Sequence, residues 1–432
     1  QVAIGGIFFV EFGANMESEG RMSTSTPFPC LQIAKHLTLG KAKDENFVFS
    51  PCSIQLALSL IANGSKGSTL EELLNFLEAE NLNHVNSVAT KLIDSFTQDD
   101  DEGTSLSFAC GVWVKQSFTL KPTFKTIAED IYRGKAEAMD FENEAKEVIC
   151  EVHKWVEKMT NGLIKSILPN FLNPRTIVLL ANALYFKGNW SNPFDELNTA
   201  DSMFYLRDGN SVEVPCMISG GNYFINTFDD FKVLKLPYDM GYKNMDNHIS
   251  MYIILPNKRD GLWALAEIVG SDPLFIEKYL SRHTERVGVK KLMLPKFKIT
   301  YKFEASKILQ EIGLKFSFSE EAEFDEIVLK LYPSDMVEVS NVHHMSVIDV
   351  DEEGTEATSV TAADMFYNLC LDEPPVPTAE FVADHPFMFV VRNDNNGTIL
   401  FMGHVVNPIV EEQQGTVSHL KMNDFPSIVC SI

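Results

Sequence analysis

Residues 347–364 read Val-Ile-Asp-Val-Asp-Glu-Glu-Gly-Thr-Glu-Ala-Thr-Ser-Val-Thr-Ala-Ala-Asp. The first four residues predict a short β-strand, and an acidic turn with one glycine follows them. Beyond the turn we apply a period of two, the spacing of side chains on one face of a strand. One face then holds only small side chains: Thr355, Ala357, Ser359, Thr361 and Ala363. The other face holds both charges: Glu356, Thr358, Val360, Ala362 and Asp364.

This alternation is typical of a strand whose small face can be buried beneath other elements. The alternative is a solvated loop, because most runs of this kind between strands lie on the surface. Three prolines, Pro374, Pro375 and Pro377, indicate that the segment ends in an exposed loop.

The first two-fifths of the chain are predicted to be mainly helical. Residues 54–62 are apolar almost all round, which predicts a central helix buried on every side. Ser68-Thr69-Leu70-Glu71 has the spacing of a capping box and precedes an apolar run to Leu77, so a second helix is expected there. Apolar residues three or four apart between Glu144 and Thr160 predict an amphipathic surface helix.

From residue 176 onward the period changes to two. Strands are expected at 177–186, 231–236, 250–255, 292–299 and 387–391, with one more helix over 303–312. Helices early and strands late favour an α+β fold over an alternating parallel sheet. Because no internal repeat or flexible linker is evident, we expect one domain at 29–408, with uncertain extensions at 1–28 and 409–432.

Composition excludes several classes of protein. The chain has 432 residues, 45% of them hydrophobic, enough for a large core. A net charge of −24 argues against nucleic acid and anionic membrane surfaces as partners. No apolar run approaches the roughly 18 residues of a membrane span. The apolar stretch Val2–Val10 lacks the positive flank of a signal peptide, so we expect the cytoplasm, with the extracellular space as the alternative.

The search for metal, cofactor and enzyme motifs is negative. Seven scattered cysteines without a C-x-x-C pair indicate neither a disulfide framework nor a zinc site, and no metal or cofactor is expected. Hydrolase, zinc-protease, dinucleotide and P-loop motifs are missing, so an enzyme is not expected. Cys150 and His153 lie three apart on a helix without a third orienting group, which favours packing over catalysis. His343 and His344 are adjacent in a strand, point to opposite faces and cannot chelate one ion.

The hinge sequence Glu-Glu-Gly-Thr-Glu-Ala at 352–357 resembles the reactive-loop hinge of the serpins. Four other segments resemble further serpin signatures: 46–54, 182–190, 381–387 and 403–408. Their order and spacing agree over about residues 30–408, nearly the whole chain. The sequence Phe-Val-Ala-Asp-His-Pro-Phe at 381–387 is most similar to that of plant serpins.

The resemblance implies a fold of three β-sheets with about eight or nine helices and an exposed reactive-centre loop. It also implies a monomeric suicide-substrate inhibitor of endopeptidases. A target protease cleaves the loop and forms an acyl-enzyme, and the hinge inserts as a new strand before deacylation finishes. The small face of the segment suits this step, since large or charged inward side chains would block insertion.

Matching to the family implies two groups of site residues. The hinge comprises Glu352, Glu353, Gly354, Thr355, Glu356 and Ala357. The sheet-opening cluster comprises Ser50, Ser53, Asn182 and His344 beneath the centre of the large sheet and Trp190 at the top, where insertion begins. For His344 the alternative is a satisfied core histidine without a switching role.

Family spacing places the scissile bond between Asn368 and Leu369, sixteen residues beyond Glu352; Phe366 and Tyr367 are the alternatives if the register slips. Residues 364–370 contain no basic side chain, so trypsin-like targets are not expected. An Asn-specific protease, including one of the cysteine class, or a chymotrypsin-like protease is expected instead.

Two departures from the family pattern keep a second hypothesis open. Residues 357–360 read Ala-Thr-Ser-Val where the family has an alanine run, and Met345-Ser346 replace the usual Lys-Ala. The alternative is therefore a non-inhibitory serpin with a storage, binding or scaffolding role, whose loop inserts too slowly to trap an enzyme.

Overall fold

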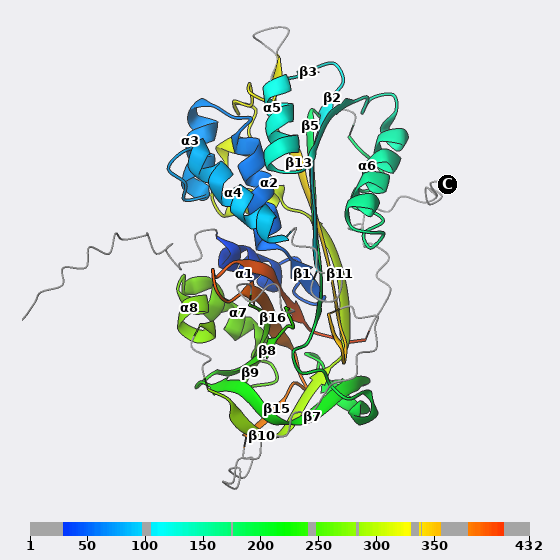
Figure 1. Ribbon diagram of the computed structural model, residues 1–432, viewed down its shortest axis with the longest axis vertical. Coiled ribbons are helices and arrows are strands. Elements are labelled where there is room, and N and C mark those ends of the chain that lie inside the picture. Colours follow the sequence, from blue (N-terminus) through cyan, green and yellow to red (C-terminus); the bar gives the residue numbers. More distant parts are fainter. Residues whose placement is uncertain are drawn as a thin grey trace, which may run out of the picture.

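The computed structural model describes residues 29–96, 105–173, 176–240, 248–281, 285–329, 337, 339–355 and 379–409. Its described α-helices are α1 (Cys30–Leu39), α2 (Pro51–Ala62), α3 (Gly67–Phe76), α4 (Leu82–Phe96), α5 (Pro122–Thr126), α6 (Ala145–Met159), α7 (Leu262–Ser271), α8 (Phe275–Leu280) and α9 (Ser306–Glu311). A π-helical turn, Ile127–Ile131, continues α5, and short 3-10 helices lie at Glu196–Asn198 and Phe316–Phe318. Figure 1 shows α2 to α5 gathered at one end of an elongated molecule.

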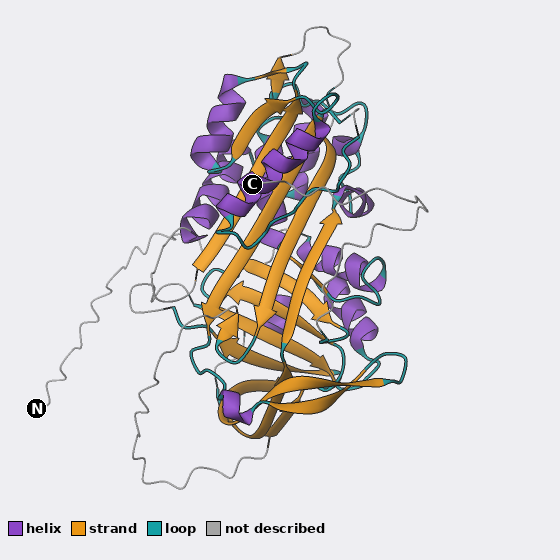
Figure 2. Ribbon diagram, turned by 90° about the vertical axis from the view of Figure 1, so that its right-hand side faces the viewer, coloured by secondary structure: helices purple, strands orange, loops and turns teal. Residues whose placement is uncertain are grey.

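A six-stranded sheet runs along the molecule (Figure 2). Its strands, in spatial order, are β11 (Phe297–Glu304), β13 (Val339–Val350), β14 (Gly354–Thr355), β5 (Val178–Asn189), β2 (Ser105–Lys115) and β4 (Lys135–Met139). β13 and β5 are parallel and pair directly from Val339 and Val178 to Val347 and Tyr185. The two-residue strand β14 lies between them only beyond that stretch.

A nine-stranded sheet packs against the first. Its path is β1 (Phe47–Phe49), β17 (Ile399–Val405), β16 (Phe387–Asn393), β9 (Ile249–Pro256), β8 (Phe231–Pro237), β7 (Ser211–Thr227), β10 (Val287–Pro295) and β15 (Ala379–Val382), with β6 (Ala200–Tyr205) paired to β7. Phe297 of β11 contacts Phe389 of β16, with ring centroids 5.5 Å apart, and so joins the two sheets. A third sheet pairs β3 (Thr119–Leu120) with β12 (Val328–Leu329).

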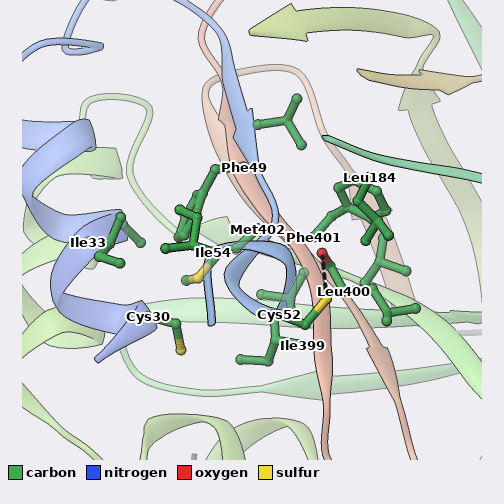
Figure 3. Packing of buried hydrophobic residues seen from close by; sticks show 14 of the residues in the cluster. Cys30, Ile33, Phe49, Cys52, Ile54, Leu184, Ile399, Leu400, Phe401 and Met402 are labelled. Carbon is green, nitrogen blue, oxygen red and sulfur yellow. Dashed lines mark hydrogen bonds between the residues drawn. The ribbon is translucent and has the colours of Figure 1, made fainter. Parts of the chain in front are cut away.

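The six-stranded sheet is covered on both faces, α6 lying on the side opposite α2 (Figure 1). On the α6 side, Val152 and Val156 pack in one apolar cluster with Trp113 of β2 and Leu179 of β5. On the other side, Ile54 of α2 belongs to the main core with Leu184 of β5, as Figure 3 shows. Burial on both faces explains why β5 is almost continuously apolar rather than alternating.

The expected α+β architecture with three sheets is confirmed, and so are the helices at 54–62 and 144–160. The helix after residue 68 is present as α3, but the capping box is wrong. Lys66 is the N-cap and makes no side-chain cap bond, while Glu323 accepts the N–H of Ser68 at 3.0 Å. A distant carboxylate thus satisfies the helix N-terminus that the local sequence was expected to satisfy.

Two boundaries also differ from expectation. The single strand expected at 292–299 is two strands, β10 and β11, which belong to different sheets and meet at Lys296. The helix expected over 303–312 is shorter, Ser306–Glu311, because β11 extends to Glu304 in register with β13. In addition, β2 supplies an inner strand, between β5 and β4, in a region expected to be mainly helical.

Candidate functional site

Two residues of the hinge, Gly354 and Thr355, are already part of the six-stranded sheet. Thr355 is paired with Val350 of β13 on one side and with Gly188 of β5 on the other, both antiparallel. Gly354 is paired with Asn189 of β5. The stub β14 therefore occupies the first position of a strand between β13 and β5.

A tight turn delivers the chain to this position. Asp351 accepts the N–H groups of Glu353 and Gly354 through Oδ1, at 3.0 and 3.1 Å. A Cβ atom at Gly354 would lie 2.1 Å from the carbonyl oxygen of Gly188, closer than atoms can approach. Glycine is required here because the backbones of β14 and β5 are in contact.

Glu352 fixes the turn through two short bonds of its carboxylate. Its side chain is 7% exposed, and its carboxylate is 2.6 Å from Lys296 Nζ and accepts the hydroxyl proton of Thr199 at 2.6 Å. Burial alone raises the pKa of Glu352, but the bonds from Lys296 and Thr199 outweigh it and hold the pKa below its ordinary value. Glu352 is thus a buried, paired anion, and Lys296 stands at the junction of β10 and β11.

Aromatic side chains enclose Thr355, which has no exposed surface. Its Oγ1 lies 2.7 Å from the hydroxyl of Tyr238, a buried residue whose pKa is raised by burial. Tyr238 stacks on Trp190 with centroids 4.5 Å apart, and Trp190 Nε1 donates to the carbonyl oxygen of Asp351 at 3.0 Å. Trp190 therefore fixes the turn through Asp351, and Tyr238 fixes the strand β14 through Thr355.

Further down the sheet, His344 of β13 centres a buried polar cluster. Its Nε2 accepts the backbone N–H of Ser50 at 3.0 Å and lies 2.9 Å from the hydroxyl of Ser346. Its Nδ1 is 2.6 Å from Asn182 Oδ1 of β5, which requires the proton on Nδ1. Burial lowers the pKa of His344 to about 3, so the ring is neutral at ordinary pH.

This cluster joins β13, β5 and the start of α2. Ser50 caps α2 by accepting the N–H of Ser53 at 3.2 Å, and Asn182 Nδ2 donates to the carbonyl oxygen of Ser53 at 3.3 Å. The hydroxyl of Ser53 is buried and has no hydrogen-bond partner within the described part of the chain. A change at the β13–β5 junction therefore reaches the first turn of α2.

The structure brings Ser50, Ser53, Asn182 and His344 together and places Trp190 apart from them, beside the hinge. Lys296, Thr199, Tyr238 and Ser346 were not anticipated. Nothing in the local sequence marks Lys296, Thr199 or Tyr238, because each reaches the site through tertiary folding. Ser346 lies two residues from His344 on the same strand face, so the period of two could have found it. Glu356, Ala357 and the candidate reactive-bond residues Phe366, Tyr367, Asn368 and Leu369 lie outside the described residues.

Cys150 and His153 do not form a thiolate pair. His153 Nε2 accepts the N–H of Leu168 at 3.1 Å, and Cys150 is disulfide-bonded, contrary to the expectation of no disulfide. Cys30, Cys52, Cys110 and Cys216 are free and buried. Within the described ranges, no group of three or more His, Cys, Asp or Glu side chains could hold a metal ion. Among the described helices, none is long and apolar enough to cross a membrane.

A family model described as serpin (serine protease inhibitor) matches residues 27–408. The chain belongs to the serpin family. It is 43% identical to Serpin-ZXA of Oryza sativa subsp. japonica over 84% of this chain and 91% of that protein, and 42% identical to Serpin-Z3 of Arabidopsis thaliana over 85% and 92%. The structure of Arabidopsis AtSerpin1 in its native stressed conformation superimposes with a TM-score of 0.80 at 36% identity, covering 90% of this serpin and all of that chain.

These comparisons confirm the resemblance to plant serpins. Members of the family are protease inhibitors rather than enzymes, and their partners are target proteases. Uncleaved ovalbumin, 24% identical with a TM-score of 0.75, shares the fold.

Proposed function

We propose that this serpin is a suicide-substrate inhibitor of endopeptidases and acts as a monomer. Cleavage of the reactive-centre loop would free residues 356 onward, and the hinge would continue as a full strand between β13 and β5 while the protease remains attached as an acyl-enzyme. The observation that carries the proposal is the position of β14, which is paired on both sides. It lies at the end of the line along which β13 and β5 pair, which we call the β13–β5 seam.

Residue chemistry at the seam supports insertion. Thr355 is small enough to fit between β13 and β5 with its side chain buried. The residues expected on the same face beyond it, Ala357, Ser359, Thr361 and Ala363, are equally small. No desolvation of an inward charge would oppose their entry.

For the target, we propose a protease that cleaves after Asn368 or, with a register slip, after Tyr367 or Phe366. The first case requires an Asn-specific protease, including one of the cysteine class, and the others a chymotrypsin-like one. A trypsin-like enzyme is disfavoured because its pocket carboxylate would find no basic side chain between residues 364 and 370.

Incubation with chymotrypsin and with an Asn-specific protease, followed by denaturing electrophoresis, tests the proposal. We expect a covalent adduct that survives denaturation, and a higher melting temperature of the cleaved chain, because the inserted strand adds pairing to the sheet. Clean cleavage near Asn368 without an adduct and without a rise in melting temperature would support the non-inhibitory alternative. Trypsin serves as the matched negative control.

A further inference from the structure

A second set of polar contacts lies on the α6 side of the six-stranded sheet. The segment that follows α6, residues 160–172, passes over the sheet, and the peptide groups of Leu168 are held from two sides. His153 Nε2 of α6 accepts the Leu168 N–H at 3.1 Å, and Lys302 Nζ of β11 donates to the Leu168 carbonyl oxygen at 2.7 Å. The Leu168 side chain is fully buried. We call His153, Leu168 and Lys302 the Leu168 clamp.

The clamp crosses the line along which the sheet would open. α6 contacts β2, and its apolar face packs in one cluster with side chains of β2, of β5 and of β13, the last through Met345 and Val347. Lys302 belongs to β11, which lies beyond β13 at the sheet edge. Because the order is β11-β13-β14-β5-β2, separation of β13 from β5 moves Lys302 away from β5 and β2. If α6 and the segment that follows it stay on β5 and β2, the bond from Lys302 to Leu168 must then stretch or break.

The His153 bond exists only while Nε2 carries no proton, since it accepts from an N–H group. Protonation would place a hydrogen on Nε2. Two N–H donors, that of His153 and that of Leu168, would then face each other, and no hydrogen bond could form between them. Protonation would also create a second cation in the neighbourhood of Lys302, whose charge already acts on His153. Burial is the main cause that lowers the pKa of His153, and Lys302 lowers it further.

His343 of β13 belongs to the same cationic neighbourhood. It is buried, it shares a sheet face with Lys302, and the charge of Lys302 acts on it as well. Burial and then Lys302 lower the pKa of His343 to about 4. Because both pKa values lie below the ordinary value for histidine, both rings are neutral at pH 7.

The carboxylates of the strands that carry His343 and Lys302 are already bonded to other groups. Glu304 of β11 is opposite His343 in register, but its Oε1 accepts the N–H of Ser306 at 2.8 Å. Asp349 of β13 pairs with Lys298 at 2.7 Å.

On α6, Glu157 lies one turn beyond His153, and Lys154 follows His153 directly. Lys165 of the covering segment is exposed. On the side of β5 and β2 the facing side chains are Ala181, Ala183, Tyr185, Ala109 and Trp113.

We propose that the Leu168 clamp is a proton-sensitive latch on sheet opening. In the neutral form it ties the segment over the sheet to both sides of the β13–β5 seam, and protonation of His153 releases residues 160–172 and speeds entry of a strand. This inference rests on the proposed function, because strand entry is the step that the proposed function requires.

The test measures strand entry without a protease. A synthetic peptide with the sequence of residues 355–368 is incubated with the full chain at pH 7.5 and at pH 5.0, and its uptake is followed by native electrophoresis and by the rise in melting temperature. Loss of one net hydrogen bond in the closed form predicts uptake about fivefold faster once His153 is protonated. His153→Gln keeps an acceptor oxygen that takes no proton in this range, so its uptake rate should respond to pH much less than that of the unmodified chain. Burial lowers the pKa of Lys302 to about 8, but Lys302 can donate to Leu168 in either form.

Further variants make the outcome decisive. His153→Ala and Lys302→Met each remove one arm of the clamp and should take up peptide faster than the unmodified chain at pH 7.5. His84→Gln, at an exposed histidine of α4, should keep the unmodified pH profile. A His153→Gln variant with the unmodified profile, or a Lys302→Met variant no faster at pH 7.5, would overturn the latch.

The latch and the inhibitor proposal fail differently. Protease trapping with no effect of pH or of His153 on peptide uptake would remove the latch and leave inhibition standing. Conversely, pH-dependent uptake through His153 without any covalent protease adduct would leave the latch and remove inhibition.

Discussion

Replacing Thr355 by arginine gives the sharpest test of the hinge. In the structure Thr355 has no exposed surface, lies between β13 and β5, and bonds to Tyr238 at 2.7 Å. A guanidinium there would have to leave water. The buried carboxylate of the turn, Glu352, is already paired with Lys296 and Thr199. The arginine would therefore be a buried cation without a partner.

The size of the effect follows from desolvation. Burying an ion without a partner costs several kcal/mol in real proteins. If about 3 kcal/mol of this appears in the barrier to strand entry, insertion slows by about a hundredfold, at 1.4 kcal/mol per factor of ten. Deacylation of the protease is unaffected by the hinge, so cleavage as a substrate should overtake trapping.

The assay is the stoichiometry of inhibition, taken as moles of serpin consumed per mole of protease inactivated. We expect Thr355→Arg to be cleaved while inactivating little of any protease that the unmodified chain traps. Thr355→Ser keeps the hydroxyl bonded to Tyr238 and is the matched control, with near-unmodified stoichiometry. If Thr355→Arg trapped protease with the stoichiometry of the unmodified chain, the argument that insertion buries this side chain would be refuted.

Three further predictions concern the same region. Gly354→Ala should push the stub out of the sheet, since its Cβ would meet backbone at 2.1 Å, and hydrogen exchange of the Thr355 amide should rise accordingly. His344→Ala leaves three buried groups unpaired and should lower the free energy of unfolding by about 3 kcal/mol in urea titration; a loss below about 1 kcal/mol would contradict the cluster's role in stability. Glu352 has a pKa below its ordinary value, so the stability it contributes is present above that ordinary value and is lost as pH falls through the folded-state pKa. The melting temperatures of the unmodified chain and Glu352→Gln should therefore converge on acidification, and a constant gap would argue against the ion pair with Lys296.

The hinge could be recognised from sequence because its pattern is local and resembles a family motif. One strand, one acidic turn with a glycine and one alternating run lie within residues 347–364. Its partners could not be located in this way. Tyr238 and Thr199 are 117 and 153 positions from the hinge residues they contact, and only the packed topology brings them there.

The errors in secondary structure have related causes. Ser68 and Glu71 have a local capping pattern, but Glu323 from a distant turn takes the N–H of Ser68 instead. The apolar run at 292–299 serves two sheets in succession, and Pro295, which ends β10, was the one local sign of the break. Tertiary contacts overrode the local preference in both cases.

The two-residue strand β14 also bears on the kinetics of insertion. Adding a strand to a sheet normally begins with a costly search, in which a free chain end must find its register before any bond compensates for its lost entropy. Here Gly354 and Thr355 have already set that register. In the proposed inhibitory mechanism, insertion would then be a propagation step without nucleation. Each brief separation of β13 and β5 would let the next residue pair, and that pairing would oppose re-closure.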